Sequence, residues 1–92
     1  MTNKLFVRNL SYQTDNSELG ALFANFGKVL SVRIPVDRQT GRGRGFGFVE
    51  MANTNAAESA MQSLNSHEFA GRKLHVSFSE ERDHRATTYG IY

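Results

Sequence analysis

The 92-residue chain contains no cysteine and no tryptophan, and it has a single proline. Without cysteine, the chain can form neither disulfides nor thiolate metal sites. The three histidines, His67, His75 and His84, do not show the short, regular spacing of zinc ligands. We therefore expect a protein with no metal, no cofactor and no disulfide framework.

Long apolar runs are also missing. No stretch of about 18 apolar residues is present, which is the length a membrane-spanning helix needs. The first ten residues, MTNKLFVRNL, lack the apolar segment and small-residue cleavage site of a secretory signal. With 39% hydrophobic residues in 92, the composition favours one domain with a modest core. We expect a monomeric cytoplasmic protein.

The charge is distributed unevenly along the chain. The net charge of +2 is too small to indicate a partner. However, four arginines lie within twelve residues, and Asp37 is the one acidic residue among them: Arg33, Arg38, Arg42 and Arg44. Such a cluster can face phosphate groups or lie in a solvated loop. Taken alone, it favours the loop, because charged residues are common on protein surfaces.

Hydrophobic periodicity predicts the element order β-α-β-β-α-β. Strands are expected over 4–10, 29–36, 44–51 and 73–79, with a short hairpin around Gly71 before the last. The helices are expected to begin at capping boxes formed by Asp15 with Glu18 and by Asn55 with Glu58, with Thr14 an equally good first cap. Their apolar stripes are Leu19, Leu22, Phe23 and Phe26, and Ala57, Ala60, Met61 and Leu64. Gly27 is expected to end the first helix in a left-handed conformation.

This order predicts an α+β fold in which two helices cover one face of a four-stranded antiparallel sheet. The arrangement is the ferredoxin-like sandwich, and right-handed crossovers place the first and third strands at its centre. The covered face should carry Leu5, Val7, Val32, Ile34, Val49, Met51, Leu74, Val76 and Phe78. We expect residues 1–80 to form the domain. Residues 81–92, polar and without periodicity, should form a flexible tail.

The segment 44–51, RGFGFVEM, places its bulky apolar groups beside its charges. In a strand, Phe46 and Phe48 share a face with Arg44 and Glu50, while the other face has two glycines. Turning the rings inward would bury unpaired charges, which costs several kcal/mol. Phe6 lies between Lys4 and Arg8 in the same way. We therefore expect three phenylalanines in one exposed patch, with Gly45 and Gly47 letting a helix approach the opposite face.

A ligand for this patch should offer flat apolar faces together with negative charge. Single-stranded nucleic acid offers both, since bases stack on aromatic rings and phosphates pair with arginine and lysine. A duplex would not present unstacked bases to these rings. RNA and single-stranded DNA remain equally open from composition and pattern.

Two segments of the chain resemble a known family. RGFGFVEM resembles the octamer [KR]-G-[FY]-[GA]-F-V-x-[FY] of the RNA-recognition motif, and LFVRNL (5–10) resembles its paired hexamer. Met51 departs from the octamer's final aromatic, but it lies on the core face, where methionine packs well. The chain is similar to small single-motif proteins of bacterial, chloroplast and glycine-rich types, which implies single-stranded RNA as the partner. The same resemblance favours the bacterial cytoplasm or an organelle as the location, and a nuclear location stays open for a eukaryotic source.

The resemblance also implies roles for individual residues. Phe6 and Phe48 should stack on neighbouring bases, and Phe46 should pack against the sugars between them. Arg44 should pair with the joining phosphate. Tyr12 is expected either to stack on a further base or only to pack. Weaker candidates for base-edge or phosphate contacts are Arg8, Arg33, Lys73, His75 and Ser77.

Other function classes are less favoured. The glycine-rich stretch lacks both G-x-G-x-x-G and the GK[ST] ending of nucleotide loops. A phosphate-handling enzyme on this fold would have Arg8 and Asn9 as its candidate groups, and both belong to the hexamer, so we expect no catalysis. A protein-interaction module is the alternative to RNA binding, with the helical face as the contact surface. An RNA chaperone and a post-transcriptional regulator would have the same sequence features.

Overall fold

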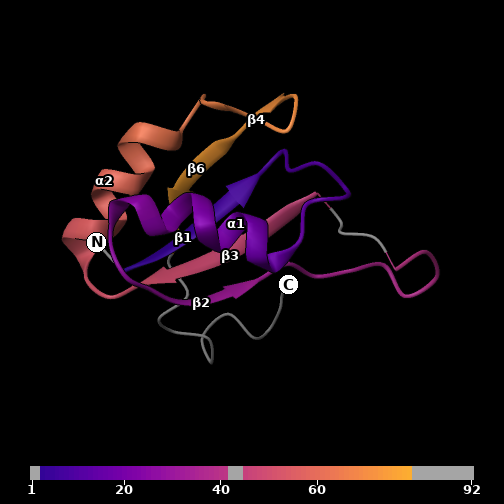
Figure 1. Ribbon diagram of the computed structural model, residues 1–92, viewed down its shortest axis with the longest axis horizontal. Coiled ribbons are helices and arrows are strands. Elements are labelled where there is room, and N and C mark those ends of the chain that lie inside the picture. The colour runs from indigo at the N-terminus through magenta and orange to yellow at the C-terminus, as the bar shows by residue number, and fades with distance from the viewer. Residues whose placement is uncertain (1–2, 42–44, 80–92) are drawn as a thin grey trace, which may run out of the picture.

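The computed structural model describes residues 3–41 and 45–79. Four strands form one antiparallel sheet in the order β2-β3-β1-β6, and both helices lie against the same face of it (Figure 1). The ferredoxin-like prediction is confirmed, with β1 and β3 at the centre. The elements are β1 (Lys4–Arg8), α1 (Asn16–Phe23), η1 (Ala24–Phe26), β2 (Val29–Arg33), β3 (Phe46–Met51), α2 (Thr54–Leu64), β4 (Glu68–Phe69), β5 (Arg72–Lys73) and β6 (His75–Phe78).

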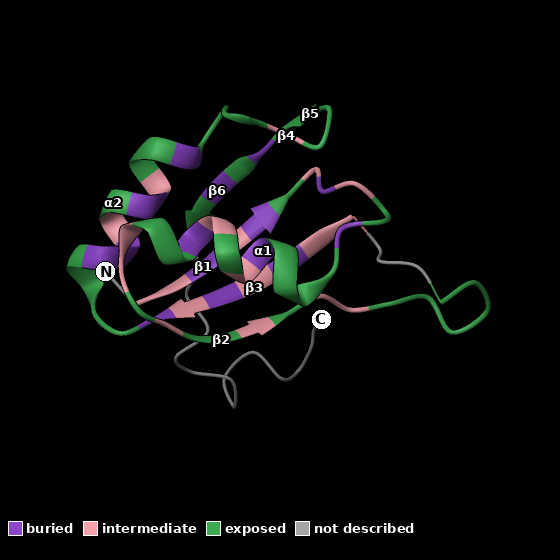
Figure 2. Cartoon of the chain, viewed as in Figure 1, coloured by how far each residue is buried: buried purple, intermediate pink, exposed green. Residues whose placement is uncertain are grey.

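The core lies between the sheet and the two helices (Figure 2). Strand burial alternates strictly on the central strands, so Leu5 and Val7 are buried while their neighbours are not. Helix α1 contributes Leu19 and Phe23, both fully buried. The predicted covered face is confirmed, with six of its members buried and three packed against the core at partial burial: Leu5, Val7, Val49, Met51, Leu74 and Val76, then Val32, Ile34 and Phe78.

Helix α1 begins at the predicted cap, whereas helix α2 does not. Helix α1 has the expected capping box, since Glu18 N donates to Asp15 Oδ1 at 2.8 Å and Asp15 N donates to Glu18 Oε1 at 3.1 Å. The predicted box at Asn55 is wrong. Asn53 caps α2 instead, accepting a hydrogen bond from Ala56 N at 2.8 Å. Because Asn53 already satisfies the first turn, Asn55 lies inside the helix.

Two glycine predictions also need correction. Gly27 follows η1 with φ 152° and ψ −179°, a mirror-extended conformation rather than the left-handed helical one. A Cβ on Gly27 would lie 2.6 Å from Ala56 Cβ, so glycine is needed where the chain passes α2. At Gly47 the close neighbours are Ile34 Cγ1 at 3.0 Å and Arg33 O at 3.1 Å. The glycine thus admits the end of strand β2 and the residue after it, not a helix.

The last predicted strand is divided in the structure. Lys73 belongs to a separate two-stranded hairpin, β4-β5, in which it pairs with Glu68. The hairpin turns at Ala70 (φ 54°) and Gly71 (φ 83°), positive values that match the tight turns of two-residue hairpins. Strand β6 begins only at His75 and pairs with β1. In the parts of the chain that the structure describes, no helix has the length and apolarity required to cross a bilayer.

Candidate nucleic-acid interface

The face of the sheet opposite the helices is arranged in rows across the strands. Strand pairing places Phe48 opposite Phe6, with Arg33 beside Phe48 on β2 and Ser77 beside Phe6 on β6. One row towards the start of β3 contains Phe46, Arg8 and His75; the row on the other side contains Ser31, Glu50 and Lys4. This register places Phe6, Phe46 and Phe48 on one face of the sheet, as predicted.

The three phenylalanines form one contiguous cluster. The rings of Phe6 and Phe48 stack with centroids 5.2 Å apart and planes at 20°. Phe46 meets both edge-on, with its centroid 5.8 Å from that of Phe6 and 6.1 Å from that of Phe48. All three side chains are partly exposed, because the rings cover one another. Such mutual packing preforms the aromatic platform and holds its rings in place.

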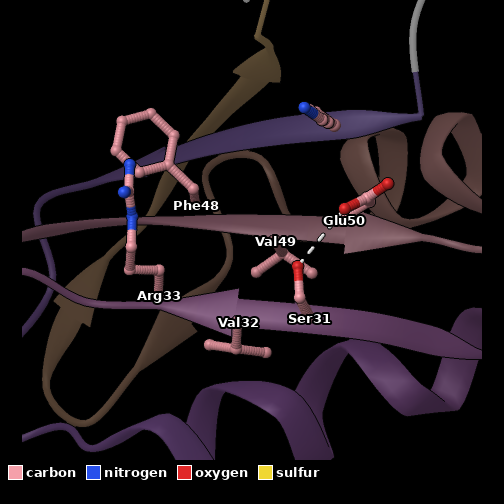
Figure 3. A pocket seen from close by; sticks show the side chains of 7 residues that line it. Ser31, Val32, Arg33, Phe48, Val49 and Glu50 are labelled. Atoms are coloured by element: carbon pink, nitrogen blue, oxygen red, sulfur yellow. Dashed lines mark hydrogen bonds between the residues drawn. The ribbon is translucent and has the colours of Figure 1, made fainter.

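Arginines border this platform on both sides. The guanidinium carbon of Arg33 lies 5.2 Å from the Phe48 ring centroid, and that of Arg8 lies 5.9 Å from the Phe6 centroid. Both distances are within cation–π range, and Figure 3 shows Arg33 beside the Phe48 ring. The positive charge is therefore held next to the rings, and arginine is a side chain that neutralises phosphates.

A second aromatic site lies at the end of the sheet where β1 finishes. Tyr12 is 53% exposed, and the guanidinium carbon of Arg72 lies 5.9 Å from its ring centroid. Asn9 fixes that guanidinium by accepting from Arg72 Nη2 at 2.7 Å and from Arg72 Nε at 3.2 Å, and it donates to Lys73 O at 2.7 Å. Gly45 lies close to the Tyr12 ring, since a Cβ on Gly45 would be 3.3 Å from Tyr12 Cε1. Its φ of 91° is also a value that favours glycine.

Arg72 and Asn9 are not among the residues that the sequence predicts to bind RNA. Asn9 has φ 66°, in the left-handed region that asparagine tolerates better than most residues. An asparagine near the end of a predicted strand is therefore the one local sign that the chain turns at residue 9. The contact with Arg72 spans 63 residues of sequence, so no local pattern could have indicated it.

The model of the RNA recognition motif family matches residues 5–75 of the chain. The chain belongs to this family. It is 42% identical over 88 residues to RbpB of Nostoc sp., a protein named for RNA binding, covering 96% of this chain and 85% of that protein. The crystal structure of RNA-binding protein PG1 matches with a TM-score of 0.82 and 44% identity, covering 88% of this chain and 98% of that one. An RNA-bound structure, the Rna15 motif with GU, matches with a TM-score of 0.82 and 25% identity, covering 87% and 85%.

Within this RNA recognition motif, most of the predicted site residues lie on one face. Those that share the open face of the sheet are Phe6, Arg8, Arg33, Phe46, Phe48, His75 and Ser77. Tyr12 lies at the end of the sheet, and Lys73 lies in the small hairpin rather than in the sheet. Arg44 lies outside the described residues. In the described segments, no group of three potential metal-ligating side chains occurs.

The opposite layer of the motif has a different charge. Helices α1 and α2, as described, contain glutamates Glu18 and Glu58 but no lysine or arginine. Arg8 and Arg33, by contrast, lie on the open face of the sheet. The positive charge next to the aromatic cluster therefore has no counterpart on these helices, which favours polyanion binding on the sheet face.

Proposed function

We propose that this chain binds single-stranded RNA on the open face of its sheet, with no catalytic step. The observation that carries the proposal is the aromatic cluster of Phe6, Phe46 and Phe48, bordered by Arg8 and Arg33. Each base stacked on an aromatic side chain contributes about 1–3 kcal/mol. The motif's place in an RNA-binding family and the RNA-bound relative support RNA as the ligand.

The proposed roles follow the register of the sheet. Phe6 and Phe48 stack on neighbouring bases, and Phe46 packs against the sugars between them. Arg44 pairs with the phosphate that joins those nucleotides. Tyr12, held by Arg72, stacks on a base at the end of the sheet. The flanking polar side chains on the same face supply base-edge and phosphate contacts: Arg8, Arg33, His75 and Ser77.

A single platform of this kind stacks about two or three bases, which gives modest affinity. The proposed domain is 1–80, followed by a tail at 81–92. Modest affinity suits post-transcriptional regulation or RNA chaperoning in a bacterial or organellar compartment. The protein-interaction alternative would use the helical layer, and no feature of that layer favours it over RNA binding.

NMR titration of the isotope-labelled chain with a short single-stranded RNA of random sequence tests the proposal. The largest shift changes are expected at the rings and amides of Phe6, Phe46 and Phe48. A hairpin-closed duplex of equal length serves as the control and should shift these signals far less. Changes confined to α1 and α2, or no changes at all, would overturn the proposal.

A further inference from the structure

A pocket of about 450 Å³ lies beside the aromatic cluster, between β2, β3 and β1. Its volume is within the range of sites that hold small organic molecules. Figure 3 shows Arg33 and Phe48 at one end of it and Ser31 and Glu50 at the other. The pocket therefore offers a base one aromatic ring to stack on, and polar groups within reach of the base's edge.

Glu50 is an acidic residue beside the aromatic cluster. Its side chain is partly exposed on the face that we propose to bind a polyanion. A carboxylate repels phosphates at short range, so phosphate contacts are disfavoured at this position. It does accept hydrogen bonds, and single-stranded RNA has two kinds of donor for it, the 2′-hydroxyl groups and the N–H groups of the base edges. Only the N–H groups differ from base to base.

The carboxylate's hydrogen bonds within the protein leave capacity for a ligand. Ser31 Oγ donates to Glu50 Oε1 at 3.4 Å, and Asn3 Nδ2 donates to Glu50 Oε2 at 3.5 Å. Both distances are longer than those of strong hydrogen bonds. Asn3 makes its short bond elsewhere, to Met51 O at 2.7 Å. Both contacts are weak, and a carboxylate has about four lone-pair sites, so the group can still accept hydrogen bonds from a ligand. Lys4, opposite Glu50 on β1, lines the same pocket.

Among the bases, guanine matches a carboxylate best. Its N1–H and N2–H donors lie side by side on one edge and can meet both oxygens of Glu50 at once. Adenine and cytosine each offer one amino group. Uracil offers a single N3–H between two carbonyl oxygens, and both of those repel a carboxylate. The chemistry of the pocket therefore ranks guanine first and uracil last.

We infer that Glu50, oriented by Ser31, makes this motif prefer guanine at the nucleotide that stacks on Phe48. The inference rests on the proposed function, because it requires RNA to occupy the sheet face. It adds a source of base selectivity that the aromatic rings lack, since every base has a π-face on which to stack.

The test measures binding of labelled eight-nucleotide RNAs by fluorescence anisotropy at fixed salt. U8 is compared with three RNAs in which one central uridine is replaced by guanosine, adenosine or cytidine. The unmodified chain is expected to bind the guanosine RNA on the order of tenfold more tightly than U8, as for other bidentate base contacts. The adenosine and cytidine RNAs should fall between them.

Glu50→Gln keeps the side-chain volume and replaces one acceptor oxygen with a donor amide. It should reduce the guanosine preference to about threefold or less, with U8 affinity unchanged or increased because the repulsion is removed. Ser31→Ala should reduce the preference partly. Glu58→Gln on α2, outside the sheet face, makes the same charge change and should leave the preference intact. Circular dichroism melts check that each variant folds.

The outcomes separate this inference from the proposed function. Equal affinity of the unmodified chain for all four RNAs, or a full guanosine preference in Glu50→Gln, overturns the role of Glu50. An adenosine RNA that binds as tightly as the guanosine RNA overturns the bidentate contact. Phe48→Ala should weaken binding to all four RNAs; if it does not, the proposed sheet-face function fails, and the Glu50 inference fails with it.

Discussion

The two faces of the sheet are built from the same strands but differ in nearly every physical respect. On the face beneath the helices, Leu5, Val7 and Val49 are at most 1% exposed. On the open face, their immediate neighbours Phe6 and Phe48 are partly exposed and lie against arginines. Alternation of side chains along a strand is enough to separate a core from a binding surface.

The comparison shows that a residue's type alone does not decide its role. Phe23 and Phe6 are both phenylalanines, and Phe23 is completely buried in the core. On α1 the inward stripe around Phe23 contains only apolar residues, whereas Phe6 shares its strand face with Lys4 and Arg8. Because charges cannot be buried cheaply, the neighbours on the same face determine which ring is exposed.

The largest expected effect is the loss of stability when a side chain on the buried face is shortened. Leu5→Ala should lower the free energy of unfolding by about 2–5 kcal/mol, because it leaves a cavity in a fully packed core. Urea unfolding measures this change. Phe6→Ala, one residue away on the other face, is the matched comparison and should lose only its ring contacts, about 0.5–1.5 kcal/mol each. Equal destabilisation by the two changes would remove the distinction between the faces.

The second largest expected effect is the loss of RNA affinity when a ring on the open face is removed. Phe48→Ala should weaken single-stranded RNA binding by about 1–3 kcal/mol while the domain stays folded, because a stacking surface is lost but no core contact. Fluorescence anisotropy and circular dichroism measure the two properties. Phe26→Ala, against the core on the helical side, is the matched control and should lower stability without lowering the affinity of the folded protein. Unchanged affinity of Phe48→Ala would show that the rings do not stack on bases.

The two faces were predictable from sequence because their causes are local. Alternation over five or six residues assigned Phe6, Phe46 and Phe48 to one face, and the charges beside them identified that face as the open one. The capping box at Asp15 was equally local, since its two partners are three residues apart. Where neighbouring residues determine a structure, the sequence pattern contains enough information to predict it.

The corrections concern features that depend on distant contacts. Asn53 and Asn55 both suit a helix cap, and in the structure the cap is Asn53, which precedes the buried Ala56 and Ala57. Gly47 admits Ile34 and Arg33, whose approach depends on the pairing of β2 with β3. The Arg72–Tyr12 contact joins residues that are 60 positions apart in the sequence. Hydrophobic periodicity within one segment does not indicate which distant residues will come into contact.

The smallest expected effect concerns the charge that accompanies the rings. Arg44, outside the described residues, is proposed to neutralise one phosphate. For about three neutralised phosphates, log K should fall with log salt at a slope near −2, and Arg44→Ala should make that slope less negative by about 0.7. Lys28→Ala removes the same charge beside Ala52, just past the other end of β3, and should leave the slope unchanged. An unaltered slope for Arg44→Ala would assign the phosphate contacts to other cations, and Arg8 and Arg33 on the open face would be the next to substitute.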